Sequence, residues 1–455
     1  MQFHVATLGC PKNEVISDYV AQLLVGVGHT IVADPLQADW LIVNTCGFIE
    51  SAREESLDVL REFVAGKRAG QKLIALGCLP ELIGECLRDE VPGVDGVLGT
   101  RRWMEITELI ARVSAADEPI PRAVPVLLGE PPAGTLLSSF GRVLRGHTDA
   151  MAYLCVSDGC NAPCAFCAIP QIKGALRSRP VADVVDEARC LVARGAKELV
   201  LIAQDTTAYG SDRGEKDALP GLLREVLRAV PDLSWLRLMY AYPQHISADL
   251  IAIMAQEPRI CHYLDLPLQH AHPDTLRRMR RPHDTERVLR ILSDLRQAMP
   301  DIALRTSLIV GYPGETEEEF ATLLHFVREV AFDRVGVFTY SREAGTPAYD
   351  LPDQLPESVK QARYDQVMTL QQQVSLQRNE AQIGRTLDVL VEGTGDGISV
   401  GRSYRDAPEI DGLVVFGGEA PIGRFASVRI TQAEIYDLAG TWVDGEPRPK
   451  KKNRR

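Results

Sequence analysis

The chain of 455 residues has no long hydrophobic run, and we therefore expect no membrane-spanning segment. No stretch approaches the roughly 20 apolar residues that a transmembrane helix requires. The N-terminus, MQFHVATLGC, lacks the basic start and long apolar core of a secretory signal peptide, so we expect a cytoplasmic protein. Low-complexity composition is absent as well, because 45% of the residues are hydrophobic and 25% are charged, as in ordinary globular domains.

Positive charge is also scarce. The formal net charge is −12, although the last residues, 447–455, contain six basic side chains and no acidic one. An acidic body disfavours DNA binding or non-specific RNA binding as the main activity. It suits a basic protein partner, and a charge that serves only solubility is the alternative.

Ten cysteines are present, but a cytoplasmic chain of this length is not expected to use them as a disulfide framework. Metal binding or catalysis is the better expectation. Cys160, Cys164 and Cys167 lie within eight residues, in the string GCNAPCAFCAIP (159–170). A structural zinc site takes four ligands, and no fourth ligand is near. Three thiolates that hold a four-iron cluster leave one iron open to a small molecule, whereas a chance group of thiols is the alternative.

Three further cysteines each end an apolar run. Cys10 follows FHVATLG, Cys46 follows WLIVNT and Cys78 follows KLIALG. The carboxyl ends of parallel strands share one crevice, so these cysteines are expected to converge. A glycine beside each of them permits close approach of the backbone to a bulky cofactor. We predict a second three-thiolate cluster, and three ordinary buried cysteines are the alternative.

The apolar pattern predicts an α/β protein with three structured parts. Residues 1–114 alternate strand-like runs with amphipathic helices, which favours a parallel α/β sheet, and 115–145 is interpreted as a linker rich in proline and glycine. Residues 146–380 hold six strand candidates with helices between them, typical of a partial (βα)6 barrel. Short glycine-punctuated β runs in 381–446 predict a small antiparallel β-barrel, and 447–455 is expected to be a disordered basic tail. The strand candidates of the first two parts are Phe3–Leu8, Trp40–Val43, Lys72–Leu76, Tyr153–Val156, Glu198–Ile202, Trp235–Tyr240, Tyr263–Leu268, Ala303–Gly311 and Arg334–Tyr340.

The two cysteine triplets and the C-terminal barrel together resemble the methylthiotransferases, a family of radical S-adenosylmethionine enzymes. The strings that carry the resemblance include TLGCPKNEV (7–15), NTCGFIESAREES (44–56), GCNAPCAFCAIP (159–170) and LRTSLIVGYPGETEEEF (304–320). The resemblance implies two 4Fe-4S clusters, S-adenosyl-L-methionine and a C-terminal TRAM domain. It also implies a division of labour. One cluster carries a sulfide that accepts a methyl group, and the other yields a 5′-deoxyadenosyl radical from a second S-adenosylmethionine.

Further strings resemble the RimO-type branch of this family, which implies methylthiolation of an aspartate β-carbon in small-subunit ribosomal protein S-twelve. These strings are CPKN (10–13), GFIESA (47–52) and GRSYRDAPEIDG (401–412). Residues 384–446 contain five basic and eleven acidic side chains, a balance that suits a basic ribosomal protein better than RNA phosphates. The implied partners are that protein, in the ribosome or free, together with an electron donor and a sulfur source. A tRNA adenosine methylthiotransferase and a non-enzymatic iron–sulfur sensor that docks on ribosomes are the alternatives.

Contacts to S-adenosylmethionine are less clearly marked than the cluster ligands. Gln204, Asp205 and Thr306 end or lie in predicted barrel strands and are candidates for this contact, with a structural hydrogen-bonding role as the alternative. No side chain is predicted to act as acid, base or nucleophile, because an unactivated C–H bond requires chemistry that a cofactor supplies. The chain departs from the expected RimO-type pattern at Ile16, Leu82, Ile83 and Ala208, whereas all six cluster cysteines are present.

Overall fold

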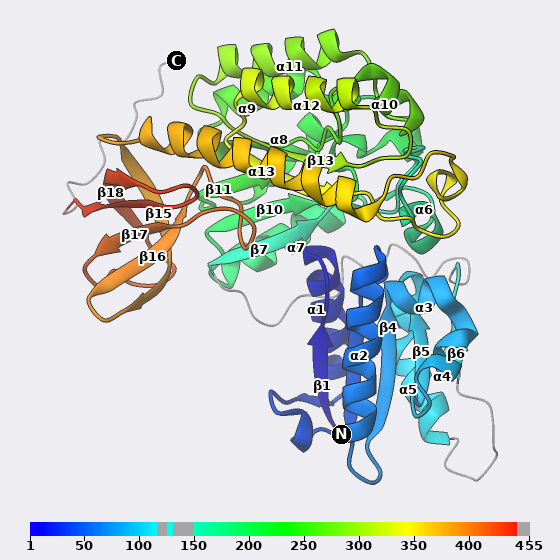
Figure 1. Ribbon diagram of the computed structural model, residues 1–455. Coiled ribbons are helices and arrows are strands. Elements are labelled where there is room, and N and C mark those ends of the chain that lie inside the picture. Colours follow the sequence, from blue (N-terminus) through cyan, green and yellow to red (C-terminus); the bar gives the residue numbers. More distant parts are fainter. Residues whose placement is uncertain (116–124, 131–149, 444–455) are drawn as a thin grey trace.

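The computed structural model describes residues 1–115, 125–130 and 150–443, which form three parts in chain order (Figure 1). No helix within these ranges is long and apolar enough to cross a membrane. The predicted basic tail, 447–455, lies outside the described residues.

The first part is a parallel sheet, as its alternating pattern predicts. Six strands pair in the order β2-β1-β3-β4-β5-β6. Their bounds are β1 (Gln2–Thr7), β2 (Thr30–Ile31), β3 (Trp40–Thr45), β4 (Lys72–Gly77), β5 (Gly96–Gly99) and β6 (Val126–Leu127). The three strands predicted from the sequence are β1, β3 and β4, which are neighbours in this sheet. Strand β6 falls within the predicted linker, of which 116–124 and 131–145 lie outside the described residues.

Helices cover both faces of the first sheet, because its central strands are apolar on both sides. The helices are α1 (Pro11–Gly26), α2 (Glu50–Gly66), α3 (Cys78–Ile83), α4 (Leu87–Glu90) and α5 (Ile106–Ala115). Leu60 and Leu79, from α2 and α3, pack on one face together with Leu87 of α4. Residues of α1 and α5 pack on the other face, in a core that continues into the second part.

The second part is an open barrel of six parallel strands with the order β14-β13-β12-β11-β10-β7. The strands are β7 (Met151–Cys155), β10 (Glu198–Ile202), β11 (Trp235–Leu238), β12 (Ile260–Asp265), β13 (Ala303–Val310) and β14 (Arg334–Thr339), and a short pair is formed by β8 (Ser157–Asp158) and β9 (Arg177–Ser178). Its helices are α6 (Ile169–Lys173), α7 (Val181–Ala193), α8 (Leu219–Ala229), α9 (Ala248–Gln256), α10 (Pro273–Arg278), α11 (Thr285–Ala298), α12 (Glu317–Val330) and α13 (Glu357–Glu380). The six predicted strands are confirmed.

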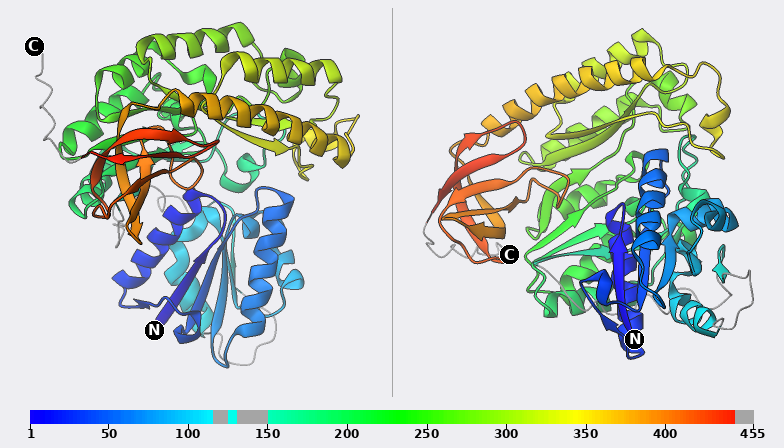
Figure 2. Two further views of the ribbon diagram at one scale, coloured as in Figure 1. Left: turned by 60° about the vertical axis from the view of Figure 1, so that its left-hand side comes forward. Right: turned by 60° about the horizontal axis from the view of Figure 1, so that its bottom comes forward.

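One face of the second sheet packs on its helices, and the opposite face is covered by the other two parts (Figure 2). Leu154, Leu201 and Leu236 point to the helical side. Their neighbours Tyr153 and Trp235 belong to the core shared with α1 and with the third part. This alternation is the ordinary consequence of a strand burying both faces.

The third part is a closed five-stranded barrel with the order β15-β16-β17-β19-β18. The strands are β15 (Thr386–Gly395), β16 (Ile398–Ser403), β17 (Val414–Gly417), β18 (Phe425–Ala433) and β19 (Leu438–Trp442). The predicted small barrel is therefore confirmed. All of its pairs are antiparallel except β17 with β19, which is parallel.

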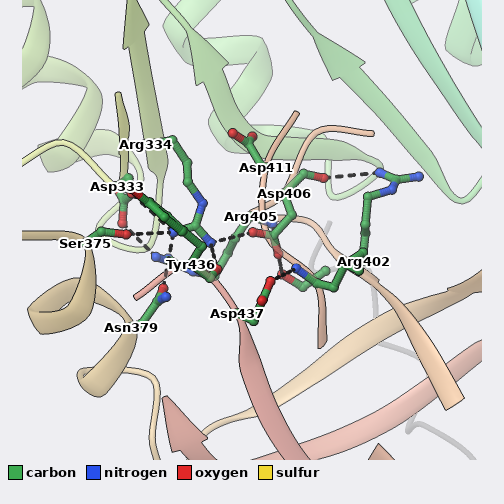
Figure 3. Close-up of polar contacts among 12 residues, drawn as sticks. Asp333, Arg334, Ser375, Asn379, Arg402, Arg405, Asp406, Asp411, Tyr436 and Asp437 are labelled. Carbon is green, nitrogen blue, oxygen red and sulfur yellow. Dashed lines mark hydrogen bonds and ion pairs between the residues drawn. The ribbon is translucent and has the colours of Figure 1, made fainter. Parts of the chain in front are cut away.

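An ion-pair network attaches this small barrel to the second part (Figure 3). The guanidinium of Arg405 lies 2.6 Å from the carboxylate of Asp333, and that of Arg334 lies 2.7 Å from Asp406. All four side chains are buried. The third part is therefore fixed to the amino ends of strands in the second sheet, since Arg334 begins β14.

Candidate functional site

The Cys160–Cys167 loop follows β7 and β8, at the carboxyl end of the first strand of the open barrel. The loop is anchored by backbone hydrogen bonds from Cys160 N to Gly174 O (3.1 Å) and from Ala165 N to Met279 O (2.9 Å). A turn bond from Cys167 N to Cys164 O (3.2 Å) brings two of the cysteines onto one bend. The carboxyl ends of barrel strands are where βα-barrel enzymes bind their ligands.

The thiols of this loop are not joined in disulfides, and all of the described cysteines are free. Burial raises the pKa of the Cys160 thiol and raises that of Cys167 to about 12. The side chain of Arg281 lies beside Cys164, with Nη1 3.6 Å from Sγ, and its guanidinium covers the ring of Tyr242 at 4.2 Å. A cation beside a sulfur ligand favours the thiolate that metal binding requires.

A cavity of about 210 Å³ opens beside Cys160. Its wall includes Asp205, Ala208, Tyr242 and His245. The buried Asp205 carboxylate accepts hydrogen bonds from the backbone N–H of Ala208 (3.1 Å) and from Thr207 Oγ1 (2.7 Å), and it lies 3.1 Å from His245 Nδ1. Asp205 therefore forms part of the cavity wall, while its carboxylate oxygens are already engaged by other residues of the protein.

The other two candidates for cosubstrate contact differ from each other. Gln204 Nε2 donates to Asp158 Oδ1 (3.2 Å), but its buried Oε1 has no hydrogen-bond partner within the described part of the chain. Such an orphaned acceptor fits a site that a ligand completes. The Thr306 hydroxyl instead donates to Leu266 O (2.9 Å) and accepts from Leu268 N (3.2 Å), which is a structural arrangement.

The second cysteine triplet lies at the carboxyl ends of three adjacent strands. Cys10 stands before the first residue of α1, Cys46 follows β3, and Cys78 is the first residue of α3. Cys10 is exposed, whereas Cys46 and Cys78 are buried. Burial raises the pKa of the Cys46 thiol and raises that of Cys78 to about 12.

Asn13 holds these three loops together. Its Nδ2 donates to Leu8 O (2.8 Å) and Thr45 O (3.1 Å), and its Oδ1 lies 3.8 Å from the sulfur of Cys78. Gly77 lets the end of β4 lie close to the end of β3, because its φ is +116° and a Cβ there would lie 2.5 Å from Thr45 O. The strand ends therefore converge as the topology predicts.

The first and second parts contact each other where α3 packs against α6. Cys78 and Leu82 form one apolar cluster with Ala168, which directly follows Cys167 in the chain, and with Ile172 of α6. Near them, the buried Lys173 donates to Thr100 Oγ1 (2.6 Å). Residues from both cysteine sites thus line one boundary between the first and second parts.

The sequence did not predict the contacts of several side chains in this region. Lys12 Nζ lies 3.5 Å from the centre of the Tyr240 ring, and Lys173 Nζ lies 3.9 Å from Asp158 Oδ1. Arg281 also belongs to this group. No spacing in the sequence marks these contacts, because they form between residues on different elements of the fold.

The four departures from the expected pattern take up apolar roles. Ile16 is buried in α1, and Leu82 packs in the cluster beside Cys78. Ile83 packs against the core of the first part, and Ala208 lines the cavity beside Cys160. All six cysteines of the two triplets are present beside these four departures.

Family comparisons match one region in each of the three parts. Residues 2–99 match the uncharacterized protein family UPF0004, residues 154–327 match the Radical SAM superfamily, and residues 383–443 match the TRAM domain.

Curated relatives match nearly the whole chain. It is 52% identical to ribosomal protein uS12 methylthiotransferase RimO of Roseiflexus sp. (strain RS-1), over 98% of each chain. It is 49% identical to the protein of the same name from Herpetosiphon aurantiacus, over 97% of this chain and 100% of that one. The corresponding protein from Anaeromyxobacter sp. (strain Fw109-5) is 46% identical, with coverage of 98% and 93%.

Solved structures with low identity share the fold. The radical S-adenosylmethionine methyltransferase TsrM from Kitasatospora setae, with cobalamin and a [4Fe-4S] cluster, is similar with a TM-score of 0.57 and 14% identity, over 88% of this chain and 77% of that one. The cobalamin-dependent radical enzyme OxsB is similar with a TM-score of 0.51 and 9% identity, over 82% and 56%.

Proposed function

Because this chain belongs to the RimO family of ribosomal protein uS12 methylthiotransferases, we propose that it transfers a methylthio group to the β-carbon of an aspartate in uS12. The observation that supports the proposal is the pair of cysteine triplets, which lie at the carboxyl ends of strands in a matched UPF0004 region and a matched Radical SAM region. Since the substrate belongs to the ribosome, the reaction is proposed for the cytoplasm.

We further propose that each triplet holds one 4Fe-4S cluster. The donors fit, because thiolate sulfur is the ligand such clusters use and three thiolates leave one iron for another ligand. The three partners of the first site are Cys160, Cys164 and Cys167, and those of the second are Cys10, Cys46 and Cys78. When bound and reduced, the first cluster supplies the electron that cleaves S-adenosylmethionine and so provides the radical that removes hydrogen from the aspartate.

The protein's own residues position and shield this chemistry. Arg281 offsets negative charge at Cys164, and the orphaned Oε1 of Gln204 is available to a bound cosubstrate. The apolar cluster of Leu82, Ala168 and Ile172 keeps water away from the boundary between the sites. A dry boundary protects a reactive intermediate from side reactions.

The small barrel favours a protein substrate over tRNA. Two of its five arginines, Arg402 and Arg405, are buried in ion pairs with acidic residues, and only Arg385, Arg424 and Arg429 are exposed. Gripping a nucleic-acid backbone requires several exposed cations. The surface of this barrel therefore offers little to RNA phosphates and suits a basic ribosomal protein. An electron donor and a sulfur source complete the proposed set of partners.

The test is a competition between substrates under anaerobic conditions. Reconstituted protein is incubated with S-adenosylmethionine, reductant, sulfide, small ribosomal subunits and bulk tRNA, and both products are analysed by mass spectrometry. We expect a methylthio increment on an aspartate-containing peptide of uS12 and none on tRNA. An increment on tRNA adenosine, or on neither substrate, would contradict the proposal.

A further inference from the structure

Lys12 presents an ammonium group at the boundary between the first and second parts. It lies in the first turn of α1, two residues after Cys10, and is partly buried. Its Nζ sits 3.5 Å from the centre of the Tyr240 ring, which follows β11 of the second part. The side chain thus reaches from the second cysteine site toward the open barrel that carries the first.

Two other cations near this boundary already have acidic partners. Lys173 lies 3.9 Å from Asp158, and Arg305 forms an ion pair of 2.8 Å with Asp265. Lys12 forms no ion pair with any carboxylate of the described residues; its Nζ lies over the Tyr240 ring, and the thiols of Cys10 and Cys155 are further electrostatic neighbours. A cation that leaves water without an acidic partner is costly, so it is expected where an anionic ligand arrives.

The surroundings hold Lys12 in place. Its neighbour Asn13 is buried and tied to the loops of the cysteine site. Tyr240 has a φ of +59°, an uncommon conformation for a bulky residue, and its N–H donates to Asp265 Oδ2 (3.1 Å). Backbone strain of this kind persists where the surrounding structure enforces it and is concentrated at functional sites. The N-terminus of α1, a helix of 16 residues, adds positive potential at the same place.

We propose that Lys12 binds the side-chain carboxylate of the substrate aspartate. This inference rests on the proposed function and adds a specificity-determining residue to it. An aspartate that enters a water-poor boundary must exchange its hydration for charged hydrogen bonds, and the ammonium of Lys12 supplies them. Holding the carboxylate also fixes the adjacent β-carbon, which is the atom that has to face the reaction.

The test compares two peptides that copy the uS12 segment around the target residue, one with the target aspartate and one with asparagine in its place. Their affinities for the full-length protein are measured by fluorescence anisotropy. We expect wild-type protein to bind the aspartate peptide about tenfold more tightly, as befits a hydrogen bond to a charged group. We expect Lys12→Met to bind both peptides with equal affinity, and Lys12→Gln carries the same expectation if Lys12→Met fails to fold.

The matched control is Lys216→Met, which removes an exposed lysine far from either triplet in sequence and is expected to keep the wild-type ratio of affinities. The proposal is overturned if wild-type protein shows no preference for aspartate or if the Lys12 variants retain it. Product formation on uS12 is measured separately. Its absence in wild-type protein would contradict the proposed function, whereas product together with an unchanged preference in the Lys12 variants contradicts only the role of Lys12.

Discussion

At the scale of single residues, the site depends on cysteines that a few neighbours bring together. Asn13 bonds to backbone on two loops of the second triplet and approaches the sulfur of Cys78. Gly77 allows β3 and β4 to end in close contact. These contacts give three cysteines that are remote in sequence one shared position in space.

Iron content tests this assignment of the second triplet. We expect simultaneous replacement of Cys10, Cys46 and Cys78 by alanine to remove about half of the iron from anaerobically reconstituted protein, since one of two four-iron clusters is lost. The measurement is iron per chain together with the visible absorption of the cluster. Cys86→Ala and Cys190→Ala, which change cysteines outside both triplets, are the matched controls and should keep full iron content. Unchanged iron in the triple variant would show that these residues hold no cluster.

The sequence predicted the two cysteine triplets but not the residues that surround them. Cys10, Cys46 and Cys78 could be grouped because each ends a β-like run, and parallel topology then places them at one edge. Arg281 and Cys164 meet although they are 117 positions apart, and Lys12 meets Tyr240 only because two separately folded parts pack together. No local periodicity encodes such contacts.

At the scale of elements, the segment 401–412 serves as a joint and is largely buried. Arg402 of β16 pairs with Glu198 of β10 at 2.7 Å, and Arg237 of β11 donates to Tyr404 O (2.7 Å). The Tyr263 hydroxyl of β12 donates to Asp411 Oδ2 (2.7 Å), a buried carboxylate oxygen in the same segment. Charged residues of the string GRSYRDAPEIDG, which resembles the RimO-type branch, therefore attach the third part to the second.

Breaking this joint is expected to destabilise the protein. Among the described residues, Arg405→Met leaves the buried Asp333 with Arg378 as its remaining charged partner. The loss of one member of a buried pair costs about 3 kcal/mol of the free energy of unfolding. Denaturant titration measures the change. Arg224→Met is the matched control, because its ion pair with Asp249 is exposed and should contribute little. Equal effects of the two substitutions would contradict the structural role of the joint.

The same joint predicts a pH dependence. Burial alone would raise the pKa of Asp333. The guanidinium groups of Arg405 and Arg378 lower this pKa by more than burial raises it, so that it lies below its usual value of about 3.9. A carboxylate with a lowered pKa in the folded state stabilises the protein above its unfolded pKa, and this contribution is lost as pH falls through the folded value.

We therefore expect the difference in thermal midpoint between wild-type protein and Asp333→Asn to be largest near neutral pH and to shrink below about pH 4. Calorimetry between pH 7 and pH 3 checks this expectation. A difference that stays constant over this range would show that the Asp333 charge does not stabilise the fold.

At the scale of the whole molecule, three parts are arranged around one boundary. The fold class, the order of the parts and the six strands of the open barrel followed from hydrophobic alternation and strand length. Strand β6 did not, because two residues that add to a sheet edge leave no periodic pattern. The packing of α3 against α6, which brings Cys78 into contact with the residues that follow Cys167, is a consequence of tertiary structure alone.

The most direct test of the central claim uses uS12 whose target aspartate carries deuterium at the β-carbon. The protein is incubated anaerobically with small subunits containing this uS12, S-adenosylmethionine, reductant and sulfide. We predict deuterium in the 5′-deoxyadenosine that is released, and a methylthio group on the same aspartate with one deuterium missing. Release of 5′-deoxyadenosine without deuterium, and an aspartate that keeps its full label, would contradict the account.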